Sequence, residues 1–312
     1  MQSGGTIRGH RPRWAGPLLA YLAATSPLAV FVPFAGGSGQ ALIVPLHLAL
    51  LAWVWAVWRG GPPRRVPGAP ARGVIAGLAD WTFPLVLPLL YAELPLLMGA
   101  LPGPVLYRDE ALRRADAVLF GGQPSLDWAT ALPVPWVSEL LHLAYLSYYA
   151  LIYVPPALLW VGLAGPRDPA ARRDAFDRTV LAMSLAMLAA FAVMIVWPVQ
   201  GPRYVAASSA PGGPVRSVAL TILEAGSSRG AAFPSSHVSL AVAQAVMALR
   251  FQRRVGVVVS VLALLLAVGA VYAGFHYLTD VVAGVALGLG AAALASSPRP
   301  LSAGETPPDE RG

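Results

Sequence analysis

The chain has 312 residues, of which 56% are hydrophobic and 12% are charged, and it contains no cysteine. A soluble domain carries about twice that share of charged residues, so the composition indicates a polytopic membrane protein and excludes thiolate chemistry. The net charge of +7 comes from arginines clustered in short loops between apolar runs, a pattern of membrane topology and not of nucleic-acid binding.

Eight apolar runs are predicted to cross a membrane, which makes the fold class all-α, a polytopic membrane helix bundle. Most approach or exceed the roughly 20 residues that a bilayer requires. The first run follows Arg8, Arg11 and Arg13 but is too long for a cleaved signal peptide, so we expect a transmembrane helix there. The expected spans are 14–34, 41–58, 75–101, 137–163, 179–198, 235–250, 255–274 and 277–296.

These spans divide the chain into three expected parts. Residues 1–136 hold N-terminal transmembrane helices and an outer interfacial segment that includes the charged stretch from Tyr107 to Asp116. Residues 137–296 form the catalytic helical core, and residues 297–312 are predicted to be a disordered cytoplasmic tail.

Arginines in alternate loops predict the orientation in the cell membrane. They place the N- and C-termini in the cytoplasm, and they place Arg203 and the starts of the sixth and eighth spans together on the extracytoplasmic face. The loop arginines are Arg59, Arg64, Arg65 and Arg72, then Arg167, Arg172, Arg173 and Arg178, then Arg250, Arg253 and Arg254.

On that face, His276 and Asp280 are spaced i, i+4, so a helix is expected to stack them on one side. A carboxylate beside an imidazole holds one ring nitrogen protonated and leaves the other as a lone pair ready to attack. The alternative is a charge pair at a helix end. A carboxylate within a membrane span is costly, which favours the catalytic interpretation.

His237 follows Pro234, Ser235 and Ser236, an ordinary helix start that also offers backbone N–H groups and a hydroxyl to an anion. His237 in that first turn is placed to protonate a leaving oxygen. Arg203 is expected to clamp phosphate through its guanidinium. Arg229 is either a second clamp or a solvated loop arginine.

Together these residues predict phosphoryl transfer through a phosphohistidine, with positioning and charge neutralisation supplying most of the catalysis. We expect no cofactor and no metal, because a magnesium site uses more carboxylates than this region offers. A zinc site built from two histidines and an aspartate is the alternative.

The segments resemble the type-2 phosphatidic acid phosphatase superfamily, whose signature joins an arginine motif, a Pro-Ser-x-His motif and a motif ending in His-x-x-x-Asp. The matches are Arg203, Pro234–His237 and His276–Asp280, within a block from about 195 to 290. The resemblance implies that His276 is the nucleophile and His237 the general acid, and that the partner is a lipid phosphate or phospholipid.

Three positions depart from the common pattern: Val196 replaces a lysine, and Gly269 and Ala270 replace a Ser-Arg pair. The form Pro198–Arg203, with Tyr277 after the last histidine, looks more like the inositolphosphotransferase branch, which includes fungal inositol phosphorylceramide synthase. That likeness leaves open whether water or an alcohol completes the reaction.

Glu139, His142 and Tyr149 share one face of the fourth span, with Tyr145 between them. With Tyr277 they form a possible substrate pocket; the alternative is an interfacial aromatic belt. Intramembrane acids such as Glu139 also suggest the alternative function, a non-catalytic lipid-binding transporter or scaffold that uses the same polar pocket. The sequence leaves the oligomeric state open.

Overall fold

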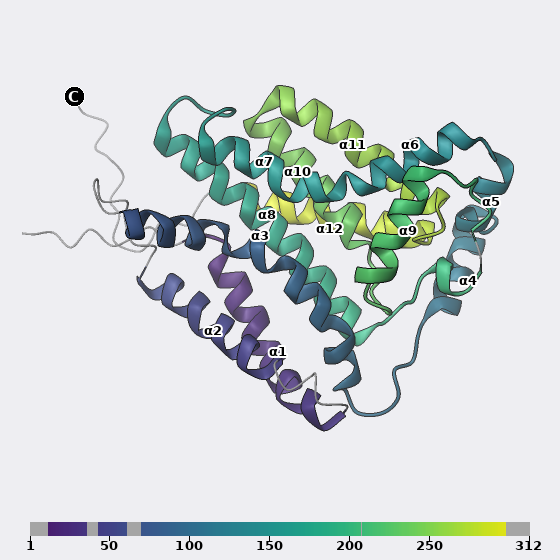
Figure 1. Ribbon diagram of the computed structural model, residues 1–312, viewed down its shortest axis with the longest axis horizontal. Helices are drawn as coiled ribbons and strands as arrows, with labels where there is room; N and C mark the ends of the chain where they lie inside the picture. Colours follow the sequence, from purple (N-terminus) through teal and green to yellow (C-terminus); the bar gives the residue numbers. More distant parts are fainter. Residues whose placement is uncertain (1–11, 36–42, 61–69, 207, 298–312) are drawn as a thin grey trace, which may run out of the picture.

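The computed structural model describes residues 12–35, 43–60, 70–206 and 208–297 (Figure 1). Regular structure in these ranges is helical, and one isolated parallel bridge joins Val199 to Ala231. The predicted all-α class is therefore confirmed. Arg8, Arg11, Arg64, Arg65 and residues 298–312 of the predicted tail lie outside the described residues.

Twelve α-helices and a short 3-10 helix follow one another in the described part of the chain. They are α1 (Ala15–Ala35), α2 (Ile43–Gly60), α3 (Pro70–Gly99), α4 (Asp109–Phe120), α5 (Pro124–Ala131), α6 (Pro135–Leu146), α7 (Tyr148–Val161), α8 (Pro169–Val196), η2 (Pro202–Tyr204), α9 (Pro214–Gly226), α10 (Ser236–Phe251), α11 (Arg253–Tyr272) and α12 (Leu278–Ser296).

Four of these helices, α3, α8, α11 and α12, are individually long and apolar enough to cross a membrane. The pair α6 and α7, bent by 47° at Ser147, makes a fifth span if it is counted as one. Helices α1, α2 and α10 carry shorter apolar stretches. The polytopic helix bundle is thus confirmed, and the count of eight spans stays a prediction.

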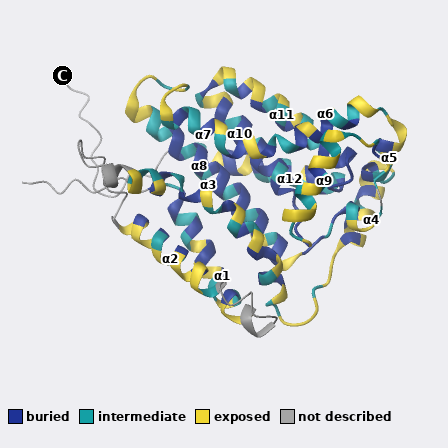
Figure 2. Cartoon of the chain, in the orientation of Figure 1, coloured by how far each residue is buried: buried dark blue, intermediate teal, exposed yellow. Residues whose placement is uncertain are grey.

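Helix α10 lies at the centre of the C-terminal bundle, packed against α7, α8, α11 and α12. Helices α1 and α3 pack on α8 and, with α2, form a layer beside it (Figure 1). Figure 2 shows buried residues along the inward faces of the helices and exposed residues on the outward faces. Outward leucines such as Leu264 and Leu294, each 66% exposed, fit a surface that meets lipid.

Two glycines of α12 let it approach α10 closely. A Cβ on Gly284 would lie 2.6 Å from the carbonyl oxygen of Ser235, and a Cβ on Gly288 would lie 2.5 Å from that of Ser239. Small residues four apart are the usual means of close packing between membrane helices. This contact fixes the start of α10, which carries His237, against the first turns of α12.

Helix α8 connects two chemically different ends of the bundle. At its start, Arg178 donates to the carbonyl oxygen of Ser296 at 2.9 Å, and Arg13 donates to Asp174 at 2.6 Å. The beginnings of α1 and α8 therefore meet the end of α12. A helix of 28 residues is about 42 Å long, so this arginine-rich end lies about a membrane thickness from the other end of α8.

Candidate active site

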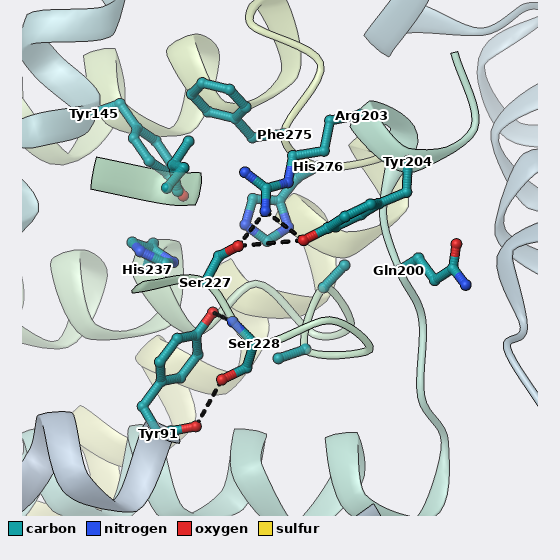
Figure 3. A pocket seen from close by; sticks show the side chains of 13 residues that line it. Tyr91, Tyr145, Gln200, Arg203, Tyr204, Ser227, Ser228, His237, Phe275 and His276 are labelled. Carbon is teal, nitrogen blue, oxygen red and sulfur yellow. Dashed lines mark hydrogen bonds between the residues drawn. The ribbon is translucent and has the colours of Figure 1, made fainter. Parts of the chain in front are cut away.

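A small pocket lies beyond the far end of α8, where loops meet the starts of α10 and α12 (Figure 3). Its free volume is about 30 Å³, which corresponds to roughly two waters because one water requires about 10–15 Å³. The lining residues are Tyr91, Tyr145, Gln200, Arg203, Tyr204, Leu223, Ser227, Ser228, Ala231, Ala232, His237, Phe275 and His276. The pocket thus contains three of the predicted catalytic and phosphate-binding residues, Arg203, His237 and His276, together with Tyr145 of the fourth predicted span.

His276 and Asp280 lie together, but not on one helix as the sequence predicts. His276 precedes the first residue of α12, and Asp280 is the third residue of that helix. Oδ2 of Asp280 accepts the N–H of Tyr277 at 2.8 Å in a capping box and lies 3.5 Å from Nδ1 of His276. Contacts of this length commonly shorten in a substrate complex. Nε2 of His276 has no hydrogen bond among the described residues, and its ring lines the pocket.

His237 enters the same pocket from the first turn of α10. Ser235 caps that helix by accepting the N–H of Val238 at 3.4 Å. The imidazole of His237 stacks on Tyr145, with ring centroids 5.0 Å apart and planes at 24°, and contacts Tyr148 at 4.1 Å. The ring centroids of His237 and His276 are 6.0 Å apart. Two helix starts therefore bring the two histidines to one space.

Arg203 lines the same pocket as the two histidines and has oxygen partners already in reach (Figure 3). Its guanidinium donates to the phenol oxygen of Tyr204 at 2.5 Å and to Oγ of Ser227. Burial raises the pKa of Tyr204, but its hydrogen bonds to Ser227 and Arg203 outweigh that effect, and the net pKa lies below the usual value for tyrosine. Both partners are neutral oxygens, which a guanidinium binds less strongly than the oxygens of phosphate. The role of Arg203 as a phosphate clamp stays a prediction.

Backbone contacts join the loops that carry these residues. Val199 donates to the carbonyl oxygen of Gly230 and accepts from the N–H of Ala232, both at 2.9 Å. Gly201 has φ +96, and a Cβ there would lie 3.0 Å from the carbonyl oxygen of Phe275. Only glycine tolerates both that backbone conformation and that approach. The loop that carries Arg203 therefore packs closely against the loops that precede His237 and His276.

Two carboxylates of α4, which do not line the pocket, bind the segments that carry Arg203 and His276. Asp109 accepts the N–H groups of Gln200 at 3.0 Å and Gly201 at 2.9 Å, and the hydroxyl of Tyr277 at 3.2 Å. Burial and the Asp109 carboxylate raise the pKa of Tyr277 well above its ordinary value, so its hydroxyl stays protonated and donates. The second carboxylate, Asp116, accepts from the first residues of α12.

Sequence reasoning assigned no role to these two aspartates, although it singled out the stretch from Tyr107 to Asp116 that contains them. Their partners are mainly backbone N–H groups, which no residue pattern reveals. The spacing of the two acids, i and i+7 on a short helix, was the available signal.

Residues 111–294, more than half of the chain, match the family model of the PAP2 superfamily. The chain belongs to the PAP2 superfamily. PAP2 membership confirms the predicted superfamily and identifies a phosphatase-type enzyme of the lipid phosphatase or phosphotransferase kind, embedded in a membrane. No curated protein and no solved structure matched the chain.

The departures from the common PAP2 pattern have a structural counterpart. A Cβ on Gly269 would lie 2.6 Å from the carbonyl oxygen of Leu141, and Ala270 is fully buried, so neighbouring residues fill the space of the Ser-Arg pair. Val196, at the lysine position, is 68% exposed at the end of α8. Arg203 is the arginine among the residues that line the pocket, and it supplies their formal positive charge.

Arg229 borders the pocket without lining it. Its guanidinium lies over the rings of Tyr107 at 5.4 Å and Tyr204 at 5.5 Å. With the Gln200 amide turned so that its oxygen faces the guanidinium, that oxygen accepts from Arg229 at 2.9 Å. Arg229 is exposed, and its role as a second phosphate clamp stays a prediction.

The other predicted site residues lie outside the pocket lining. Ser235 and Ser236 are 0% and 1% exposed, and Ser235 uses its hydroxyl as a helix cap. Nδ1 of His142 lies 2.7 Å from the carbonyl oxygen of Ser138, and Tyr149 is 48% exposed. The remaining two make protein contacts: Tyr277 donates to Asp109, and Glu139 accepts the N–H groups of Val215 and Arg216 at the start of α9. Their contact with substrate stays a prediction.

Proposed function

We propose that this protein is an integral membrane enzyme that cleaves a phosphoester or phosphodiester of a lipid through a phosphohistidine on His276. One observation carries the proposal. A nucleophile backed by a carboxylate, a second histidine and an arginine line one pocket, although they come from three segments far apart in the sequence.

In the first step, Nε2 of His276 attacks phosphorus as the bond from phosphorus to the leaving oxygen breaks. Asp280 orients the ring by accepting a hydrogen bond from the Nδ1–H of His276, from which its Oδ2 lies 3.5 Å away. Protonated His237 gives its proton to the leaving oxygen, so that the alcohol departs neutral. Arg203 exchanges Tyr204 and Ser227 for the phosphoryl oxygens and neutralises their charge.

In the second step, a hydroxyl attacks the phosphohistidine and the bond from phosphorus to nitrogen breaks. His237, now neutral, takes the proton of the attacking hydroxyl, which returns both histidines to their starting states. If water attacks, the lipid phosphate is hydrolysed. If an alcohol attacks, the phospho-headgroup is transferred, as the resemblance to the inositolphosphotransferase branch suggests.

The proposed enzyme lies in the cell membrane with its pocket on the extracytoplasmic side and both termini in the cytoplasm. The arginine-rich end of the bundle supports this orientation, because arginines concentrate in cytoplasmic loops. The chain has no native cysteine, so a Ser208→Cys variant reports one site alone. An impermeant thiol reagent is expected to label it in intact cells; labelling only after lysis contradicts this orientation.

The central test is turnover by purified protein in detergent with dioctanoyl phosphatidic acid, phosphatidylinositol or a prenyl diphosphate. His276→Ala is expected to lower turnover by at least about a thousandfold. The matched control is His47→Ala, a buried histidine of α2 outside the pocket, which is expected to retain turnover if it folds. Thermal unfolding of each variant separates lost chemistry from lost structure.

Full turnover by His276→Ala contradicts the mechanism. If wild-type protein shows no turnover on the panel but transports lipid, and His237→Ala/His276→Ala transports it equally, the alternative of a lipid-binding transporter or scaffold replaces the enzyme. For an active wild type, reaction in ¹⁸O-labelled water distinguishes the two outcomes. Hydrolysis places the label in the released phosphate compound, whereas transfer to an added alcohol acceptor does not.

A further inference from the structure

Helix α4 buries two carboxylates, Asp109 and Asp116, beside the pocket. Asp109 is 9% exposed and Asp116 is 0% exposed. Among the described residues, neither takes part in an ion pair, whereas Glu110 on the exposed side of the same helix pairs with Arg113 and Arg114. Buried charges are costly unless other groups satisfy them, so the bonds that the two aspartates do accept are informative.

Asp116 binds the start of α12. Its Oδ2 accepts the N–H of Leu278 at 3.0 Å, and its Oδ1 accepts the N–H of Thr279 at 2.9 Å and the hydroxyl of Thr279 at 2.6 Å. The first N–H groups of a helix have no partner within the helix, and its dipole favours a negative charge there. Asp116 therefore holds the helix start that lies between His276 and Asp280.

Asp109 binds the turn before Arg203. Its two carboxylate oxygens accept the N–H groups of Gln200 and Gly201, and Oδ1 also accepts the hydroxyl of Tyr277. Each aspartate thus accepts two backbone N–H groups and one hydroxyl. The backbone partners of Asp109 belong to the turn before Arg203, and those of Asp116 belong to the start of α12 after His276. The hydroxyl of Tyr277 also ties Asp109 to the segment that carries the nucleophile.

Because the two aspartates lie on one helix, their bonds set the distance between the turn before Arg203 and the start of α12. Residues seven apart lie on one face of a helix, separated by about 10.5 Å along its axis. We propose that Asp109 and Asp116 are positioning residues and that α4 is a rigid spacer, which sets the arginine turn at a fixed distance from the nucleophilic histidine. This inference rests on the proposed function for the roles of Arg203 and His276.

The two aspartates act on different parts of the reaction, so their variants have different kinetic effects. Asp109→Asn loosens the turn that carries the phosphate clamp and is expected to raise KM about tenfold with a smaller change in kcat. Asp116→Asn loosens the start of α12 and is expected to lower kcat at least tenfold with little change in KM. A role confined to folding stability does not produce opposite patterns from two positions on one helix face.

The experiment compares wild type, Asp109→Asn, Asp116→Asn and the control Glu110→Gln, whose side chain is 58% exposed. Hydrogen exchange of the full-length protein in detergent needs no turnover. We expect faster exchange at the amides of residues 278–279 in Asp116→Asn only and at 200–201 in Asp109→Asn only, with Glu110→Gln like wild type. Kinetics with dioctanoyl phosphatidic acid then measure the split between kcat and KM.

The spacer proposal is overturned if amide exchange at residues 200–201 and 278–279 is unchanged in both aspartate variants. It is also overturned if Asp109→Asn and Asp116→Asn lose the same share of kcat and raise KM by the same factor. If the asparagine variants do not fold, Asp109→Glu and Asp116→Glu replace them, and the same split at smaller magnitude is expected. If exchange responds as described but wild type does not turn over any lipid phosphate, the spacer stands as a structural device and the proposed function fails.

Discussion

Two buried histidine–carboxylate pairs lie in different regions of this molecule. In the N-terminal layer, Nδ1 of His47 lies 3.2 Å from Oε2 of Glu93, and its Nε2 lies 3.0 Å from the carbonyl oxygen of Leu22. In the C-terminal bundle, Nδ1 of His276 lies 3.5 Å from Oδ2 of Asp280, and its Nε2 has no hydrogen bond among the described residues. The residue types are nearly the same, but the second nitrogen is used differently.

The difference shows that the surroundings of a pair decide its role. His47 and Glu93 are each 1% exposed and connect α1, α2 and α3 through their bonds, so both ring nitrogens serve packing. His276 presents its second nitrogen to a pocket that also contains His237 and Arg203. We expect the first pair to govern stability and the second to govern chemistry.

The sharpest test of this contrast removes the carboxylate charge from each pair. Asp280→Asn is expected to lower kcat by about 10² to 10⁴-fold because the imidazole loses its orienting acceptor. Glu93→Gln is expected to keep kcat while lowering the free energy of unfolding by about 1–3 kcal/mol. Phosphate release and thermal unfolding on the same preparations measure both quantities; equal kinetic losses contradict the division of roles.

The general-acid assignment of His237 predicts a dependence on the leaving group. His237→Asn is expected to slow cleavage of an alkyl phosphate by about a hundredfold, because an alkoxide leaves poorly without a proton. Cleavage of a p-nitrophenyl ester is expected to slow less, since that group leaves as a stable anion. Comparing the single-turnover rates of the two substrates tests the assignment, and an equal loss on both contradicts it.

A third prediction concerns the packing that fixes the C-terminal pair. Gly284→Ala places a Cβ 2.6 Å from the carbonyl oxygen of Ser235 and is expected to cost about 1–3 kcal/mol and to lower kcat. Gly290→Ala is the matched control, because a Cβ there meets nothing within 4 Å. Alanine favours a helix over glycine by up to about 1 kcal/mol, so that control is expected to be neutral or stabilising.

The smallest effect is expected at the start of α9. Glu139 accepts the N–H groups of Val215 and Arg216 at 2.7 and 3.1 Å. Glu139→Gln removes a charge that complements the helix dipole and is expected to cost about 0.3–1 kcal/mol. Urea unfolding measures this cost. A large loss of kcat would instead give Glu139 the role in the substrate pocket that the sequence suggested.

Much of the fold and three of the pocket residues were predictable from the sequence. Apolar runs of membrane length gave the helix bundle, and residue types and spacing singled out His237, His276 and Arg203, which the structure brings to one pocket. The helix bundle and the convergence of these three side chains were predictable because they depend on composition and on short local patterns, whereas their catalytic roles stay predictions.

The remainder depended on contacts that no local pattern records. The His-x-x-x-Asp spacing suggested one helical face, but Asp280 reaches back as a cap to a residue before the helix. Glu139 looked like a substrate ligand and caps α9. Asp109 and Asp116 bind mainly backbone N–H groups of distant loops, and such partners become visible only once the chain is folded.

The most direct test of a phosphohistidine on His276 is to trap the phosphorylated enzyme. Wild-type protein is mixed with phosphatidic acid labelled in its phosphate, quenched in alkali, where a phosphohistidine persists, and digested for peptide mapping. Label is expected on the peptide that contains His276, and it is expected to be lost on brief acid treatment and to be absent from His276→Ala. Turnover without label on that peptide, or label on another residue, contradicts a phosphohistidine on His276.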